Sequence, residues 1–437
     1  MRLKSLLRLE TLKRTWFLVI LSIGVINLSC VCGQLGSPVY EAIAVGETND
    51  LVVDPAGTVH VLYSFYALAR RADSVYGVYY AHRSGDGDWQ TEALETRRGH
   101  NQVHAFGMGS DGALRAFYGT TRHTEYAWKE TGGAWEKETF LTNGFVGDVA
   151  FDADGAMHLA YVHWLTDTFL FDNVRPLYAY KPADGGFHSR EIEIEGLRDV
   201  NYGQVSDIAV DSSGRAHMVF DVRALVVREI DYLQIAADDG DITPRETIAS
   251  GWSTNWHPSL AIDGDDGLHM AFTGYYTTEP GEEYKPKLKY TVSYDGGATW
   301  AEEMLVDAED ETGQSPELAI DDAGGLHIAY LSPESYEVRY AYKAPGAESW
   351  SVETVDSDVP TDVDVSLALD GEGNPFILYS KVSPDTPETP KVTDTPWAPD
   401  MTDTPWTPDW ADFLDLKLAH RTGDGRWVAE TIPSPLQ

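Results

Sequence analysis

One pattern recurs seven times along the chain, and it limits the possible folds more than any other feature. Its clearest form, VAFDADGAMHLAY (149–161), is an apolar run, an Asp-Gly turn and a second apolar run ending in an aromatic residue. The other copies begin at Leu51, Phe106, Ile208, Leu260, Leu318 and Leu367. Successive copies start 43 to 59 residues apart, which is typical of one supersecondary unit repeated with variable loops.

Each copy continues into two further predicted strands. A third apolar segment such as RYAYK (339–343) follows a variable loop, and a Gly-rich turn leads to a segment such as WSVET (350–354). Alternating β-branched and aromatic residues between Asp/Gly turns are typical of antiparallel hairpins. No stretch after the N-terminal segment shows a sustained helical apolar period. Residues 34–437 therefore predict one all-β domain, a seven-bladed β-propeller of four-stranded antiparallel blades, in preference to six or eight blades.

The pattern leaves open how the ring closes. WVAETI (427–432) predicts the outer strand of the last blade. VYEAIAVG (39–46) also has the pattern of an outer strand, so it either adds to that blade or lies across the junction between the last blade and the first.

Residues 293–300, SYDGGATW, fit Ser-x-Asp-x-Gly-x-Thr-Trp at the turn between the third and fourth strands of the fifth copy. In such a turn the Asp accepts backbone N–H bonds, the glycines relieve steric strain and the Trp packs alongside. The predicted structural residues are Ser293, Asp295, Gly297, Thr299 and Trp300. With degraded versions of this turn in other copies, the chain resembles the Asp-box (BNR-repeat, sialidase-like) propeller superfamily. Asp boxes lie on the blade periphery in that family, so the resemblance implies a fold and not an activity.

The resemblance does not extend to sialidase catalysis. Sialidases of this superfamily bind the substrate carboxylate with three arginines, the first in a Phe/Tyr-Arg-Ile-Pro motif ahead of the first Asp-box blade. They add a Tyr–Glu nucleophile pair and an Asp acid/base. Residues 34–50 contain no arginine, and Arg175-Pro176 lies in a third-blade loop without the flanks of that motif. A sialidase is therefore not favoured.

The net charge of the chain limits the classes of partner that it can bind. The chain holds 70 Asp and Glu against 32 Lys and Arg, for a formal net charge of −38. Such a surface repels phosphate backbones and anionic headgroups, so we expect no nucleic-acid partner. A well-solvated secreted surface explains the acidity, and adaptation to a salty medium is the alternative.

Residues 1–33 have the pattern of an export signal. A basic start precedes the apolar run 16–28, which is short for a membrane span. Val-Cys-Gly before Gln34 suits ordinary signal peptidase, whereas Asn-Leu-Ser-Cys resembles a bacterial lipobox with Asn27 in place of an aliphatic residue. Cys30 is the candidate lipidation site, and we expect membrane contact only through this signal or a lipid. Cys30 and Cys32 are the only cysteines, so the propeller has no disulfide and no thiol nucleophile.

Ligands of propellers usually gather at the axis, on the face where loops enter the innermost strands and where second-to-third-strand loops lie. Sugar sites need flat aromatic faces for pyranose rings and fixed polar donors, and the chain places such residues there. Asp148 and Asp207 also fall at the starts of innermost strands. The predicted substrate-binding residues are Arg71, Asn101, Gln102, Arg122, Trp164, Arg175, Gln204, Arg223, Trp256 and His257. Arginines at this face of an acidic chain favour an anionic glycan.

Catalytic candidates come from the same face. His100, His163 and Tyr202 could supply the general base, charge neutraliser and proton donor for β-elimination from a uronate. RGHNQVH (98–104) loosely resembles polysaccharide lyases on seven-bladed propellers that use a His/Tyr pair near an Arg. The alternative is that each His is a hydrogen-bonded loop residue. Blade architecture is predicted for the histidines that recur at one position of the repeat: His60, His158, His217, His269 and His327.

We predict no metal site and no cofactor. DADG (152–155) and DGDDG (263–267) have some calcium-loop character but lack the downstream Glu of an EF-hand. Asp-Gly turns in hairpins explain both segments, with structural calcium as the alternative.

A Pro/Trp-rich insertion at 383–410 interrupts the seventh copy and contains TDTPWAPD (393–400) and TDTPWTPD (402–409) in tandem. Proline this dense prevents regular strands and helices. The insertion is either a disordered loop or an arm whose Trp397, Trp406 and Trp410 cover the axial face or hold a partner protein.

The sequence thus predicts an exported, secreted or surface-anchored monomer that binds or processes an extracellular glycan. If it is an enzyme, a lyase or hydrolase of anionic polysaccharide is expected. The competing prediction is a non-catalytic propeller scaffold for another protein. Convergence of His100, His163 and Tyr202 in one pocket would favour the enzyme, and their dispersal the scaffold.

Overall fold

In the computed structural model the chain divides into two units, Met1–Val39 and Tyr40–Gln437. The described residues are 40–69, 75–97, 101–120, 123–164, 174–192, 201–223, 228–236, 242–244, 246–251, 256–276, 285–309, 312–360, 363–383 and 413–435. The predicted export signal, with Cys30, lies outside them. Among the described residues no helix has the length and apolarity that crossing a membrane requires.

The described part of the second unit is all-β, with seven blades of four antiparallel strands. Blades one and two are built from β1 (Tyr40–Val53), β2 (Thr58–Ala69), β3 (Val75–Ser84), β4 (Gln90–Glu95), β5 (Gln102–Met108), β6 (Leu114–Gly119), β7 (His123–Lys129) and β8 (Glu136–Thr142). Blades three and four are built from β9 (Gly144–Phe151), β10 (Met157–Trp164), β11 (Val174–Lys181), β12 (His188–Glu191), β13 (Asn201–Val210), β14 (Ala216–Arg223), β15 (Arg228–Ile235) and β16 (Glu246–Gly251). Blades five to seven are built from β17 (Trp256–Ile262), β18 (Leu268–Tyr276), β19 (Lys285–Ser293), β20 (Met304–Leu305), β21 (Gln314–Ile320), β22 (Leu326–Ser332), β23 (Glu337–Lys343), β24 (Ser351–Ser357), β25 (Val365–Leu369), β26 (Pro375–Val382), β27 (Phe413–Arg421) and β28 (Trp427–Thr431).

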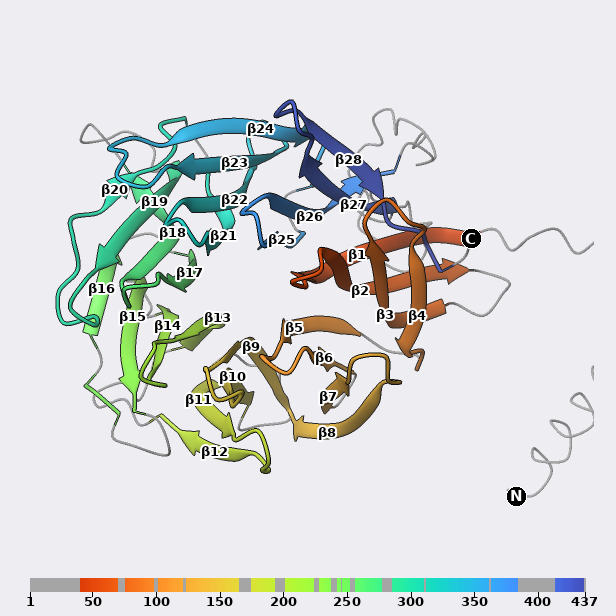
Figure 1. The fold of residues 1–437 in the computed structure, drawn as a ribbon, viewed down its shortest axis with the longest axis horizontal. Coiled ribbons are helices and arrows are strands. Elements are labelled where there is room, and N and C mark those ends of the chain that lie inside the picture. The colour runs from red at the N-terminus through yellow and green to blue at the C-terminus, as the bar shows by residue number, and fades with distance from the viewer. Residues whose placement is uncertain are drawn as a thin grey trace, which may run out of the picture. The chain divides into compact units, whose positions relative to one another are not determined.

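The blades form a closed ring around one axis (Figure 1). The first strand of each blade is innermost, and these strands contact one another in the cycle β1, β5, β9, β13, β17, β21, β25 and back to β1. The predicted seven-bladed propeller is confirmed. We call the end where the innermost strands begin the upper face, and the end with the Asp-Gly turns the lower face.

β1 settles how the ring closes. Along its length β1 pairs with β2, but Ile43 and Ala44 also pair in parallel with Phe413 and Leu414 of β27 in blade seven. The N-terminal half of β1 therefore lies across the junction, the second of the two predicted arrangements. β28 is the outer strand of blade seven and pairs with β27.

The hydrophobic core lies between blades. Seven clusters of buried side chains each draw on two adjacent blades, and together they fill all seven blade interfaces. Between blades four and five, Val219 and Tyr232 pack with Leu260, Met270 and Phe272. Because each blade is covered on both faces, its middle strands bury side chains of either orientation, and every residue of β22 is buried.

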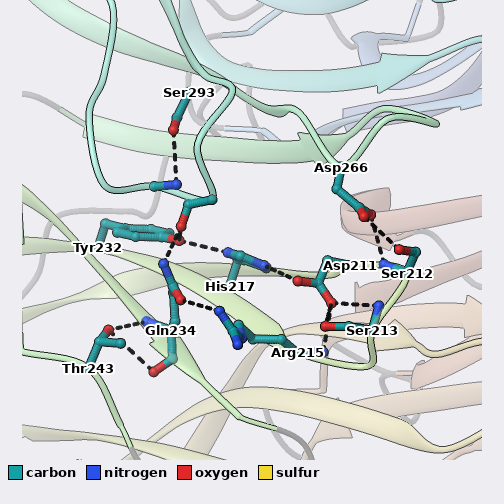
Figure 2. Close-up of polar contacts among 12 residues, drawn as sticks. Asp211, Ser212, Ser213, Arg215, His217, Tyr232, Gln234, Thr243, Asp266 and Ser293 are labelled. Atoms are coloured by element: carbon teal, nitrogen blue, oxygen red, sulfur yellow. Dashed lines mark hydrogen bonds and ion pairs between the residues drawn. The ribbon is translucent and has the colours of Figure 1, made fainter.

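A hydrogen-bonded unit of Asp, His and Tyr recurs in five blades. In blade four, His217 Nδ1 lies 2.7 Å from the Tyr232 hydroxyl and Nε2 lies 3.2 Å from the Asp211 carboxylate (Figure 2). Burial lowers the pKa of His217, so its imidazole is neutral, with Nε2–H donating to Asp211 and Nδ1 accepting from Tyr232. The other four units are centred on His60, His158, His269 and His327. These histidines are therefore engaged in blade architecture.

The SYDGGATW turn of blade five (293–300) is held by its own polar side chains. The Asp295 carboxylate accepts hydrogen bonds from Thr299 N–H at 2.8 Å and Thr299 Oγ1 at 2.6 Å. Ser293 Oγ accepts from Gly297 N–H at 2.9 Å and donates to Asp295 at 2.8 Å. Both oxygens of the Asp are used within the turn, so it has a structural role.

This turn also docks blade five on blade four. The Gly296 carbonyl accepts a hydrogen bond from the Gln234 amide and lies 3.0 Å from the Tyr232 hydroxyl. The Trp300 ring meets the Tyr232 ring edge-on at 5.4 Å. The same edge-on contact, at 5.2 to 5.4 Å, joins other neighbouring blades through Trp135–Tyr80, Trp350–Tyr290 and Trp427–Tyr340.

Two adjacent glycines allow a test of this docking. Gly296 and Gly297 have φ of 70° and 86°, where a Cβ costs about 1–2 kcal/mol. A Cβ on Gly296 meets nothing within 4 Å, but one on Gly297 would lie 2.2 Å from the Tyr232 hydroxyl oxygen. We expect Gly297→Ala to destabilise the protein by about 1–3 kcal/mol more than Gly296→Ala, through overpacking. Equal shifts of the urea unfolding midpoint, followed by tryptophan fluorescence, would contradict the docking role.

Candidate functional site

One position of the repeat faces the axis in every blade, directly before the apolar residues of the innermost strand. Strand register identifies it, because in each blade this residue pairs with the one two positions after the repeat His or its equivalent. Its seven occupants are Asp50, Ala105, Asp148, Asp207, Ser259, Glu317 and Ser366. We call these the axial residues.

Most axial residues hydrogen-bond to the next blade. Asp50 Oδ2 accepts from Phe106 N–H of blade two at 2.8 Å, and Asp207 Oδ2 accepts from Leu260 N–H of blade five at 2.7 Å. In the same way, Asp148 Oδ2 accepts from Ile208 N–H at 3.3 Å and Ser259 Oγ from Leu318 N–H at 3.0 Å. Ser366 Oγ links blade seven to blade one by donating to the Asn49 carbonyl at 3.1 Å. Five axial residues therefore join five of the seven pairs of neighbouring innermost strands.

Four carboxyls belong to this set, and their pKa values are raised. Burial raises the pKa of Asp50 to about 7. Burial also raises the pKa values of Asp148 and Asp207, and the charge of Asp207 raises that of Asp148 further. The pKa of Glu317 is raised well above its ordinary value, first by the surrounding protein and then by negative charges on Asp207, Asp50 and Asp364. Those charges come from three other blades, so the carboxyls interact across the axis.

Glu317 differs from its neighbours in reaching solvent. Its side chain is exposed, whereas Asp50, Asp148 and Asp207 are half-buried. It makes no hydrogen bond within the described part of the chain. A carboxyl that solvent can reach and whose pKa is raised takes up a proton at a higher pH than an ordinary Glu, and once protonated it can donate a hydrogen bond or the proton to a ligand. No group of three or more His, Cys, Asp or Glu side chains among the described residues is arranged to hold a metal ion.

Sequence reasoning identified only part of this set. Asp148 and Asp207 were expected at the starts of innermost strands, but Asp50 and Glu317 were not singled out. The available signal was an acidic residue four positions before the turn Asp, as in DVAFD (148–152) and ELAID (317–321). The convergence of the four carboxyls was not visible, because consecutive copies lie about fifty residues apart.

The turns considered for calcium are held by hydrogen bonds. Asp152 Oδ1 accepts the N–H groups of Asp154 at 3.0 Å and Ala156 at 2.7 Å, and Oδ2 lies 3.4 Å from His158 Nε2. Asp263 repeats this arrangement at its own turn. Both oxygens of each carboxylate thus have partners within the blade.

The upper face carries the predicted binding residues that the structure describes. Strand pairing sets His163 opposite Arg175 in blade three, and Asn201 opposite Arg223 in blade four. β10 and β13 are in contact, which brings these strand ends onto adjacent blades. Also at upper strand ends or bulges, by backbone placement, are Trp164, Tyr202, Gln204 and Trp256. His100, Arg71 and Arg122 lie outside the described residues, as does 384–410 of the insertion.

Three further predicted residues have described side chains. Asn101 folds back on its own loop, where its amide donates to the Arg97 carbonyl at 2.9 Å. Gln102 is exposed and begins β5. His257 has a φ of 50° in the bulge that precedes Ser259, a left-handed conformation that is uncommon for a residue with a Cβ.

Solved structures with the same architecture perform different chemistry. No family model and no curated protein matches this chain. The fold is similar to that of an ulvan lyase of polysaccharide lyase family PL25, with 12% identity over 78% of this chain and 93% of that chain, and a TM-score of 0.54. It is also similar to hydrazine synthase of Kuenenia stuttgartiensis, with 11% identity over 80% and 95% and a TM-score of 0.52. The GH93 α-L-arabinofuranosidase of Fusarium graminearum matches at 14% identity over 65% and 89%, with a TM-score of 0.47. At these identities the likeness shows the fold alone.

The raised pKa values determine whether the folded state gains or loses stability as the pH rises. An axial carboxyl is protonated in the folded state at pH values where it is ionised when unfolded. Its stabilising contribution is complete below about pH 4, the pKa of an aspartate in the unfolded chain. This contribution is lost as the pH rises through the pKa of the folded state, which is about 7 for Asp50. Buried histidines such as His217, with lowered pKa values, act in the opposite sense up to about pH 6.5. The histidines are the same in the wild type and in a variant of an axial carboxyl, so their contribution cancels when the melting temperature of one is subtracted from that of the other.

We expect Glu317→Gln to stabilise the protein increasingly as pH rises from 5 to 9, because it removes a charge and no described hydrogen bond. The measurement is the difference in melting temperature between variant and wild type across that range. Glu372→Gln is the control, since Glu372 is exposed in a lower-face turn. A Glu317→Gln difference that is flat with pH, or that follows the control, would contradict the axial coupling.

Proposed function

We propose that this propeller is an exported protein that binds or processes an extracellular polysaccharide with acidic sugars. The observation that carries the proposal is the pairing of Arg175 with His163 at the upper end of blade three, with Arg223 at the upper strand end of the adjacent blade four. Elsewhere the chain has a large excess of acidic residues, 70 against 32 basic ones. Arginine binds carboxylates and sulfates in a planar, two-pronged manner, and aromatic rings stack on sugars.

The fold neighbours give this proposal context. The ulvan lyase is described as bound to a disaccharide unit of glucuronic acid and sulfated rhamnose, a strongly anionic ligand. We further propose that the chain is a diverged Asp-box propeller, in which the SYDGGATW turn is retained and sialidase residues are not. Export would use residues 1–33, with Cys30 as the lipid site if the protein is surface-anchored.

Lyase chemistry is the first candidate reaction. A base would take the C5 proton of a uronate, the C4–O bond would break, a C4=C5 double bond would form, and an acid would protonate the leaving oxygen. His100, His163 and Tyr202 are the proposed base, neutraliser and donor. β10, which carries His163, contacts β13, which carries Tyr202, so the two strands are close enough for a shared role.

Hydrolysis is the second candidate, and the axial carboxyls favour it. Glycoside hydrolysis commonly needs one protonated carboxyl and one carboxylate near the scissile bond. Glu317, with its raised pKa and exposed side chain, has the properties of the acid. A non-catalytic scaffold that binds a protein through the Trp-rich insertion is the remaining alternative.

The proposal is tested by mass spectrometry of polysaccharides after incubation with the protein. The panel holds polygalacturonate, alginate, hyaluronan and ulvan, with neutral glucan and xylan as comparisons. Fragments lacking the elements of water identify a lyase, and fragments that have gained water identify a hydrolase. Unchanged polysaccharides that also fail to bind would overturn the proposal and leave the scaffold.

A matched pair of arginines tests the binding surface. Arg223 ends β14 at the upper face, and Arg215 immediately precedes the same strand at the lower face. We expect Arg223→Ala to weaken binding of an acidic polysaccharide about ten- to hundredfold, as loss of a charged hydrogen bond implies, and Arg215→Ala to leave it unchanged. Affinity electrophoresis measures both, and equal effects would place the binding surface elsewhere.

A further inference from the structure

Two tyrosine rings stand out among the described side chains because each is more than a third exposed. Tyr294 is 75% exposed and lies in the SYDGGATW turn on the lower face. Tyr336 is 53% exposed and lies in the turn between β22 and β23 on the upper face. This turn is the one second-to-third-strand loop that the described residues include in full.

Tyr336 has a backbone conformation that tyrosine rarely adopts. Its φ is 54°, in the left-handed region, where glycine would be free of strain. Its carbonyl accepts a hydrogen bond from Val359 N–H at 2.9 Å, which ties the turn to the connection between blades six and seven. Strain kept at an exposed aromatic residue points to a role for the side chain, since the fold alone would be better served by glycine.

Side-chain hydrogen bonds to blade six also hold the turn that carries Tyr336. Ser335 Oγ donates to Glu337 Oε2 at 3.0 Å, and Arg339 Nε donates to the same oxygen at 2.8 Å. Arg339 is buried, and its guanidinium also donates to Asp307 at 3.1 Å. The flanks of Tyr336 are thereby fixed to the body of blade six, so the ring projects from a rigid base.

We propose that Tyr336 is an aromatic platform on which a sugar ring of the bound glycan stacks. The inference rests on the proposed glycan function and adds a binding residue on blade six, one blade beyond the predicted set on blades one to five. A pre-formed exposed ring suits stacking because little conformational entropy is lost when the sugar binds.

The surroundings of Tyr336 favour a sugar over a protein partner. Exposed Glu334 and Ser335 and the half-buried Glu337 lie next to it, so the ring is not part of an apolar patch. Protein interfaces centre on aromatic residues that are enclosed by other contacts and lose all their water. A single ring amid polar groups instead matches a pyranose, which offers one apolar face and a rim of hydroxyls.

The test is affinity electrophoresis in gels that contain polygalacturonate, alginate, hyaluronan or ulvan, run with the complete protein. We expect Tyr336→Ala to weaken retardation roughly two- to tenfold, the range of an aromatic contact, and Tyr336→Phe to keep it. Tyr294→Ala is the control, an exposed tyrosine on the opposite face. Tyr336→Gly should lose retardation while its melting temperature rises, because glycine relieves the left-handed strain.

The outcomes separate this inference from the proposed function. If wild type is retarded and Tyr336→Ala is retarded equally, the platform is overturned and glycan binding stands. Equal weakening by Tyr336→Ala and Tyr294→Ala would also overturn it. If no polysaccharide retards wild type, both the proposed function and the platform fail.

Discussion

Contact between neighbouring blades is the interaction on which the rest of this structure depends. A four-stranded blade with two apolar faces cannot bury either face alone, so each blade needs a neighbour on both sides. Burying one large apolar side chain contributes about 1.5–3 kcal/mol, more than the 0.5–1.5 kcal/mol of one edge-on aromatic pair. The apolar clusters therefore supply most of the stabilisation. The repeated Trp–Tyr contacts give four of the interfaces a defined geometry, and the His–Tyr hydrogen bonds join strands within a blade.

Closing the ring imposes a second requirement at the axis, where backbone N–H groups of the innermost strands need acceptors. A carboxylate meets this need twice, as Asp50 does for Leu51 and Phe106. A serine hydroxyl such as Ser259 meets it once, for Leu318, but brings no charge. Burial at the axis raises the pKa values of the four carboxyls, and the repulsion among them adds to the shift. The raised pKa values are thus a consequence of how the blades are joined.

Features that depend on residues close together in the sequence could be predicted, and features that depend on contacts between distant segments could not. The Asp and His of each structural unit lie six residues apart across one turn, so the repeat revealed them directly. Strand order and blade number followed from the same local pattern. The crossing of β1 to β27 did not, because Ile43 and Phe413 are joined only when the ring closes. The axial carboxyls and the left-handed Tyr336 likewise depend on packing between segments distant in the sequence.

The fold restricts the choice of residues more strongly on the lower face of the propeller than on the upper face. On the lower face, six blades repeat one turn in which the Asp Oδ1 accepts two backbone N–H groups. A substitution there removes acceptors that the turn needs. The segments that form the upper loops instead vary in length and residues from copy to copy. Arginines and exposed rings can therefore accumulate on the upper face without weakening the blades, and this is the physical reason to look for a ligand there.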